Sequence, residues 1–335
     1  MILDLAFVWA GLIAFAVLAY VVLDGFDLGI GMLFPVLGDD ANRDTAMNSV
    51  APVWDGNETW LVLGGGGLLA VFPLAYAVIL PALYPLVIAM LLGLVLRGVA
   101  FEFRWRTERG KFLWDWSFTL GSLIATLSQG LMLGALVQGI RVEGRAYAGG
   151  WYDWLTPFSV MTAAALVTGY ALLGAAWLVL KTEGSLQTLA FRLARRLAFA
   201  LLAAIVIVSA WTPLLDAQFL TRWFTFPAIV YVAPVPLLTA FAGWRLIASI
   251  ERRRDAEPFL WTLALFVLCY VGLGISLYPK IVPPSITIWQ AAAPDTSLLF
   301  LLVGAAVLIP IILAYTAYSY WVFRGKVRVG EGYHH

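Results

Sequence analysis

Long apolar stretches separated by short polar segments repeat along nearly the whole chain. A bilayer core about 30 Å thick needs roughly 20 mainly apolar residues per helix. This length divides the sequence into nine predicted membrane-spanning helices, at about residues 5–28, 58–77, 80–101, 116–138, 157–180, 197–215, 225–245, 258–278 and 298–322. The second and third belong to one apolar block, which we interpret as a tight helical hairpin interrupted at Pro73 and Pro81. The pattern predicts an all-α integral membrane protein in which residues 1–335 form a single transmembrane domain.

Composition agrees with this interpretation of the pattern. Hydrophobic residues make up 62% of the chain, charged residues make up 12%, and the mean hydropathy is +0.89. These values lie outside the range of soluble globular proteins. The formal net charge of +1 gives no excess of Lys and Arg that could neutralise phosphates, so we expect no nucleic-acid partner.

The basic residues predict how the helices are oriented. Nine spans put the two termini on opposite sides of the membrane. Of the 21 Lys and Arg residues, 17 fall on the side of the C-terminus, and the other side has 4, namely Arg141, Arg145, Arg222 and Lys280. Cytoplasmic loops carry the excess of Lys and Arg. We therefore expect a cytoplasmic C-terminus and a periplasmic N-terminus.

Histidine is nearly absent from the chain. The two histidines are His334 and His335, beyond the last predicted span. Haems and copper ions in membranes are normally held by His, sometimes together with Met or Cys. No predicted span can supply such a His ligand, so another chain would have to hold the metal in any redox chemistry.

Two carboxylate pairs lie at the same predicted end of the spans. Asp24 and Asp27 are three residues apart near the end of the first span, and Asp55 and Glu58 repeat that spacing at the start of the second. Residues three apart share one face of a helix. Ionisable groups near membrane depth are costly and are therefore candidates for function. These four acids are our candidate proton path.

A third segment would add positive charge to this group. Arg97 lies toward the end of the third predicted span, and Glu102 and Arg104 follow it. If packing brings the three segments together, four acids and two arginines meet at one cytoplasmic mouth. Desolvation and the arginines would then shift the carboxyl pKa values in opposite directions, which tunes a proton-relay group.

Simpler interpretations of the same residues remain open. Asp55 is also placed to cap a helix, and Asp24 and Asp27 could pair with Arg97 or Arg104 for stability alone. Tryptophans near predicted span ends, including Trp54 and Trp60, are typical of an interfacial belt. A polar stripe in the fourth span favours hydrogen bonding between helices over a hydrated path; it consists of Thr119, Ser122, Thr126 and Gln129.

Several longer stretches together resemble one known family. They are "DGFDLGIG", "NSVAPVWDGNETWLV", "RGVAFEFR", "GYALLGAAWLVLKTEG", "VPPSITIWQAAAPDTS" and "ILAYTAYSYWVF", spread over residues 24–323. The chain resembles subunit II of the cytochrome bd-type ubiquinol oxidases. The forms "WDGNETW" and "VPPSITIW" look closest to the cyanide-insensitive branch.

The resemblance implies a partner subunit and a division of labour. In that family a related subunit I carries two b-type haems and one d-type haem, oxidises quinol at the periplasmic side, and reduces oxygen to water with protons from the cytoplasm. Subunit II has a similar fold, two four-helix bundles plus one peripheral helix, and binds none of the haems. The resemblance therefore implies haem b and haem d on the partner and no cofactor on this chain. It also implies a multi-pass protein of the bacterial inner membrane.

The resemblance also assigns roles to two of the candidate acids. The Asp of the family's "WDGN" motif is associated with the cytoplasmic proton route and matches Asp55, and the second Asp of "DGFDLG" matches Asp27, with a structural or proton-path role. Some family members hold a structural quinone or lipid in this subunit, but no motif here places one. Small single-span subunits, quinol and membrane lipids are the further partners that the resemblance implies.

Our leading hypothesis is a haem-free subunit II that stabilises subunit I and contributes to proton uptake. A proton-coupled secondary transporter is the alternative, because spans with buried acids would also suit that function. However, no matching pair of interrupted spans is evident in the sequence. A third possibility is a purely structural subunit, which would tolerate substitution at Asp55 and Glu58.

Overall fold

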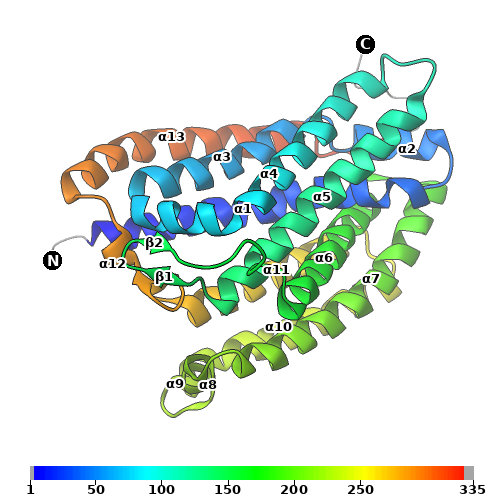
Figure 1. Cartoon of the computed structure of the whole chain (residues 1–335). Coiled ribbons are helices and arrows are strands. Elements are labelled where there is room, and N and C mark those ends of the chain that lie inside the picture. Colours follow the sequence, from blue (N-terminus) through cyan, green and yellow to red (C-terminus); the bar gives the residue numbers. More distant parts are fainter. Residues whose placement is uncertain (1–3, 328–335) are drawn as a thin grey trace.

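The computed structural model describes residues 4–327, and almost all of its elements are helices (Figure 1). The long helices are α1 (Leu5–Leu33), α3 (Trp54–Val71), α4 (Pro73–Arg104), α5 (Lys111–Gln138), α6 (Pro157–Lys181), α7 (Gly184–Trp211), α10 (Pro234–Glu251), α11 (Glu257–Leu277) and α13 (Asp295–Val322). The short helices are α2 (Asp40–Asn48), α8 (Ala217–Phe224), α9 (Ala228–Val232) and α12 (Ile288–Ala291), with 3₁₀ turns at Phe34–Val36 and Thr212–Leu214. Two small antiparallel hairpins pair β1 (Val142–Glu143) with β2 (Ala146–Tyr147), and β3 (Lys280–Val282) with β4 (Ile286–Thr287).

Eight segments of the described chain are long and apolar enough to cross a membrane: Leu5–Val36, Pro73–Arg104, Lys111–Gln138, Pro157–Lys181, Gly184–Leu214, Ala228–Glu251, Glu257–Leu277 and Asp295–Val322. The segment between the first two, α3, is not among them. It contains 18 residues and carries the second predicted span. Its first turn is polar and its centre is the run of four glycines at residues 64–67, so it is less apolar than its neighbours.

The break between α3 and α4 differs from the prediction. We expected the second span to continue to about residue 77, but α3 ends at Val71 and α4 begins at Pro73. Proline is well tolerated in the first turn of a helix, where its missing N–H would have no intrahelical partner. Pro81 and Pro85 lie inside α4, so neither of them interrupts the hairpin.

Two groups of helices pack side by side. In one, α1 contacts α3 and α5, and α4 lies along α5; in the other, α6 contacts α7 and α11, and α10 lies against α7 and α11. The contacts of α6 with α1 and α5 join the two groups. Figure 1 shows α13 running along α1 and α3 at the edge of the molecule. Helices satisfy most of their backbone hydrogen bonds internally, which suits the apolar interior of a membrane.

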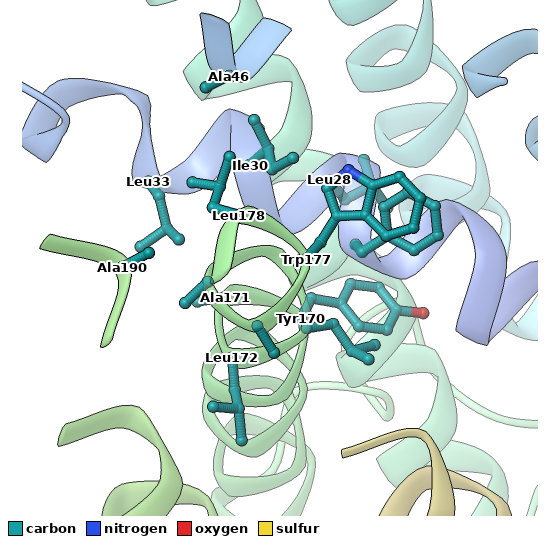
Figure 2. Packing of buried hydrophobic residues seen from close by; sticks show 14 of the residues in the cluster. Leu28, Ile30, Leu33, Ala46, Tyr170, Ala171, Leu172, Trp177, Leu178 and Ala190 are labelled. Carbon is teal, nitrogen blue, oxygen red and sulfur yellow. The ribbon is translucent and has the colours of Figure 1, made fainter. Parts of the chain in front are cut away.

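A large buried cluster lies where α1 meets α6. Side chains from α1, α2, α6 and α7 meet there, among them Leu28, Ala46, Trp177 and Ala190 (Figure 2). The Phe26 and Trp177 rings stack with their centroids 4.2 Å apart. Ring stacking of this kind stabilises a core beyond the apolar area that it buries.

Glycines allow these helices to touch backbone to backbone. A Cβ on Gly29 of α1 would collide with the Tyr170 carbonyl of α6, and a Cβ on Gly174 would lie 2.6 Å from the Gly29 carbonyl carbon. Gly93 and Gly121 make a similar contact between α4 and α5. Small residues at helix crossings are typical of membrane proteins, where close packing replaces the hydrophobic driving force.

The two ends of the helices differ in composition. The end that carries α2, the α4–α5 loop and the last residues of α13, here called the α2 end, has all the Lys and Arg residues of the predicted cytoplasmic set except Arg328, which lies outside the described residues. The opposite end, here called the hairpin end, carries the β1–β2 and β3–β4 hairpins and the four remaining basic residues. The proline-rich segment at residues 278–297 folds over its own helices there, because Val282, Ile286 and Ile288 are buried.

Candidate functional site

Three helices bring the predicted acids together at the α2 end. Asp24 and Asp27 lie near the end of α1 and are both fully buried. Glu58 lies in the second turn of α3, and Arg97 lies two turns before the end of α4. The contacts of α1 with α3 and of α3 with α4 place these residues on facing helix surfaces.

Arg97 connects two of the carboxylates. Its Nη1 donates to Asp24 Oδ1 at 2.5 Å and its Nη2 donates to Glu58 Oε2 at 2.6 Å. The Arg97 and Asp24 side chains are fully buried, whereas the Glu58 side chain keeps 28% of its surface exposed. Guanidinium–carboxylate bonds of this length are strong because both partners are charged. The sequence interpretation in which Asp24 pairs with Arg97 is therefore confirmed by the geometry.

Asp27 has a different set of hydrogen-bond partners. Asn57 Nδ2 donates to Asp27 Oδ2 at 2.8 Å and also to the Leu23 carbonyl at 3.2 Å. Asn57 Oδ1 accepts from the Tyr320 hydroxyl of α13 at 2.8 Å. Our sequence analysis missed Asn57 and Tyr320 as site residues. Asn57 stands inside the "WDGN" motif, so its place between two candidate acids was an available signal.

Arg104 belongs to a separate cluster. Its Nη1 donates to Asp44 and its Nε donates to Asp115, both at 2.6 Å. Lys111 contacts Asp44 at 3.1 Å, and Arg43 contacts Asp115 at 3.3 Å. The expected single mouth with two arginines is thus divided into two charge clusters. Asp44 and Asp115 pair with Arg104 because α2 and the start of α5, which carry these two acids, cover that part of the α2 end.

Asp55 and Glu102 belong to neither ion-pair cluster of the described residues. Both side chains are exposed, and within residues 4–327 the structure gives neither of them an ion pair. Asp55 stands in the first turn of α3, beside Trp54. Its position is accessible to water or to a partner chain, while the buried acids lie on the inner side of the same helix end.

The two flanking tryptophans are packing residues here. Trp54 stacks on Phe101 with ring centroids 4.8 Å apart and an interplanar angle of 4°, and it also lies 5.9 Å from the Arg97 guanidinium. Trp60 is only 1% exposed and packs beside Tyr20. Trp60 therefore has a packing role, because its turn of α3 faces α1.

The polar stripe on α5 behaves differently from the prediction. Thr119 and Thr126 donate to carbonyls of their own helix, four residues earlier. Only Gln129 reaches neighbouring helices: its Nε2 donates to the Tyr20 hydroxyl at 2.8 Å, and its Oε1 accepts from Tyr170 at 2.9 Å. Short hydroxyl side chains on a helix commonly bond to their own backbone. The interhelical role is thus confirmed for Gln129 but not for the two threonines.

The group around Arg97 has more acids than bases. Asp24, Asp27 and Glu58 supply three carboxylates, and Arg97 supplies one guanidinium. With every group ionised the net charge is −2, which is costly in surroundings of low dielectric. The group can therefore hold an additional proton, and Glu58 gives it one part-exposed member.

Residues 4–327 contain no group of three or more His, Cys, Asp and Glu side chains arranged to hold a metal ion. Both histidines, His334 and His335, lie outside the described residues. The described helices therefore offer no imidazole for a haem iron, and we derive no step through a haem on this chain.

Comparisons with known proteins agree with one another. The family model described as cytochrome bd terminal oxidase subunit II matches residues 5–323. The cytochrome bd-I ubiquinol oxidase subunit 2 of Escherichia coli (strain K12) is 29% identical, with 96% of this chain and 95% of that relative covered. The cytochrome bd ubiquinol oxidase subunit 2 of Bacillus subtilis (strain 168) is also 29% identical, over 95% of this chain and 96% of that relative.

A solved structure supports the same fold. The bd oxidase from Geobacillus thermodenitrificans includes a chain that matches with a TM-score of 0.72 and 18% identity, over 96% of this chain and 99% of that one. With several apolar helices and these relatives, the protein is a multi-pass bacterial membrane protein. The comparisons do not favour the transporter alternative. The family model covers nearly the whole described chain, and the chain therefore belongs to the family of cytochrome bd terminal oxidase subunit II.

Proposed function

We propose that this chain is the haem-free subunit II of a quinol:oxygen oxidoreductase, with b- and d-type haems held by a partner subunit I. In this proposal it has nine membrane-spanning helices, counting α3, as two four-helix bundles with α13 at the periphery. It stabilises subunit I and contributes to the uptake of protons for the reduction of oxygen to water. The observation that carries the proton role is the group of three carboxylates around Arg97, of which Asp24 and Asp27 are fully buried.

The exposure of the acids suggests an order for proton entry. Asp55 is exposed at the start of α3, Glu58 is part-exposed, and Asp24 and Asp27 are buried. We assign proton collection to Asp55, transfer to Glu58, and storage to the two buried acids. Arg97 holds Asp24 and Glu58 in place, and Trp54 supports Arg97 from one side. Proton exchange is most effective when the carrier's pKa is near the working pH.

The orientation of the protein belongs to the same proposal. The α2 end would face the cytoplasm, because it carries the excess of Lys and Arg. Asp55 would then open on the compartment that supplies the protons. Quinol, membrane lipids and small single-span subunits are the further partners we propose, and a quinone or lipid bound in this subunit has a structural role.

The first experiment replaces Asp55 with Asn in the assembled oxidase. The amide keeps the size of the side chain but cannot carry a proton. We expect quinol-driven oxygen uptake to fall by about 100-fold or more, the range that a single proton-transfer group contributes. The reduced-minus-oxidised haem spectrum should stay unchanged, because no haem ligand is altered.

Glu108→Gln is the matched control, because Glu108 is an exposed acid in the α4–α5 loop at the same end. It should leave oxygen uptake unchanged. Wild-type turnover in Asp55→Asn would leave Asp55 only as a first-turn acid that interacts favourably with the dipole of α3. Wild-type turnover in both Asp55→Asn and Glu58→Gln would favour the purely structural subunit.

A further inference from the structure

α13 is held to the rest of the protein mainly at its two ends. Only 6% of its most apolar stretch is buried within the chain. At the hairpin end, Trp9 Nε1 donates to the Leu298 carbonyl at 3.0 Å. At the α2 end, the last turn of α13 and residues 323–327 contact α6, and these contacts involve a buried lysine.

Lys181, the last residue of α6, has 5% of its surface exposed. Its ammonium donates to the carbonyls of Phe323 and, at 2.7 Å, of Gly325, and it lies 5.4 Å from the centre of the Trp177 ring. Within residues 4–327 the structure gives Lys181 no carboxylate partner. Its charge is instead opposite carbonyls at the C-terminal end of α13, where the helix dipole is negative.

The same segment returns hydrogen bonds to the end of α6. Val327 N donates to the Lys181 carbonyl at 2.8 Å. Lys326 pairs with Asp255 at 2.6 Å and contacts the Thr182 carbonyl at 3.3 Å. We call Lys181 and residues 323–327 the C-terminal clasp. It fixes the end of α13 against α6.

One turn before the clasp, Tyr320 points back into the site. Its ring lies 6.2 Å from Trp177, edge to face, and its hydroxyl donates to Asn57 Oδ1 at 2.8 Å. Trp177 therefore contacts both Lys181 and Tyr320, so the clasp and the tyrosine are supported by one side chain.

The two acceptors beside Asn57, Asp27 Oδ2 and the Leu23 carbonyl, select one orientation of its amide. An amide oxygen only accepts hydrogen bonds, and an amide nitrogen only donates them. Nδ2 donates to Asp27 Oδ2 and to the Leu23 carbonyl, and Oδ1 then accepts from the Tyr320 hydroxyl. The flipped amide would place its oxygen against these two acceptors, which is unfavourable. By donating to Oδ1, the Tyr320 hydroxyl thus anchors the Asn57 side chain in the position from which Nδ2 donates to Asp27.

We propose that Tyr320, held in place by Lys181 and the C-terminal clasp, is a positioning residue that fixes Asp27 through Asn57. This inference rests on the proposed function, because it assumes that Asp27 carries protons. It gives α13, the least buried of the eight apolar spans of the described residues, a part in positioning a buried acid on α1.

The test uses the assembled oxidase with Tyr320→Phe, Lys181→Met, Lys181→Arg and Asp27→Asn. Tyr320→Phe keeps the ring and removes only the hydroxyl, so kcat should fall by up to about tenfold, the value of one hydrogen bond, while KM for quinol is unchanged. Lys181→Met should lower kcat in the same direction, and Lys181→Arg should restore it, because Arg keeps the charge. The double variant Lys181→Met with Tyr320→Phe should be no slower than the slower single variant, because both act on one contact.

Tyr315→Phe is the matched control, since Tyr315 lies on the same helix with 67% of its surface exposed. Amide hydrogen exchange of residues 320–327 gives a readout that is independent of turnover, and it should speed up in Lys181→Met. Wild-type kcat in Tyr320→Phe together with a slow Asp27→Asn would overturn the inference alone. Wild-type kcat in Asp27→Asn would remove the proton role of Asp27, and the inference with it.

Discussion

At the scale of single residues, the notable feature is a guanidinium buried between carboxylates. Arg97 has no exposed surface, and neither has Asp24. Burying two charges costs several kcal/mol each, about what their attraction returns when the geometry is good. Such a pair adds little net stability but makes the loss of one partner costly. The stability of the site should therefore suffer more from the loss of one charged partner than it gains from the intact pair.

Arg97→Met should therefore destabilise the assembled oxidase strongly. The change leaves Asp24 and Glu58 near one another without a counter-charge, at a cost of about 3–5 kcal/mol for breaking a buried pair. We expect a lower melting temperature and a lower yield of haem-containing complex. Adding Asp24→Asn should recover part of both losses, since it removes the unpaired charge. A single Arg97→Met variant as stable as the wild type would contradict this account.

Sequence reasoning identified the charged residues of the site better than their connections. Their positions in the predicted spans placed the four candidate acids at one end of the helices. The structure pairs Arg97 with two of them, Asp24 and Glu58. Neither the partners of Arg104 nor the hydrogen bond from Tyr320 to Asn57 could be predicted. The latter joins residues 263 positions apart, and only the packing of α13 brings them together.

At the scale of helices, close crossings depend on glycines, which have no side chain. α1 and α6 touch through Gly29 and Gly174, where either Cβ would meet the backbone of the other helix. Hydropathy identified both helices but cannot show which glycine is at a crossing. The start of α4 was misplaced for a related reason: Pro73 opens a helix, whereas Pro81 lies within it, and sequence alone does not distinguish these two uses.

Gly29→Ala should push α1 away from α6. Overpacking a close contact costs about 1–3 kcal/mol, and here the opposing atoms are backbone and cannot rotate away. We expect a clear drop in the melting temperature of the purified oxidase. Gly11→Ala, on the same helix with no atom within 4 Å of the added Cβ, should be neutral or slightly stabilising. Equal melting temperatures for the two variants would show that the crossing has room for a methyl group.

At the scale of the whole molecule, charge divides the two ends of the helices. Basic residues gather at the α2 end, and the hairpin end carries four. This asymmetry was readable from the sequence because it depends only on the order of apolar and polar segments. The packing of α13 along α1 and α3 was not, since an apolar helix has no pattern that marks its neighbours.

Cysteine labelling tests the orientation that follows from this asymmetry. In a Cys269→Ala background, which removes the one native thiol, Arg109→Cys marks the α2 end and Arg145→Cys marks the hairpin end. A membrane-impermeant maleimide should label Arg145→Cys from the periplasm. Arg109→Cys should react only after the inner membrane is opened. The reverse labelling pattern would mean that the membrane orientation is opposite to the one proposed and that Asp55 does not face the cytoplasm.

The modest apolarity of α3 has a consequence for biosynthesis. α3 carries Asp55, Asn57 and Glu58 in its first two turns and is not among the segments apolar enough to cross a membrane alone. α4 follows after a single residue, and its most apolar 18-residue stretch has a mean hydropathy of 2.5. The translocon would therefore receive the two helices as one hairpin, with α4 supplying the partitioning free energy that α3 lacks. In that hairpin Arg97 already faces Glu58, so the ion pair of the mature site would also shield a carboxylate during its entry into lipid.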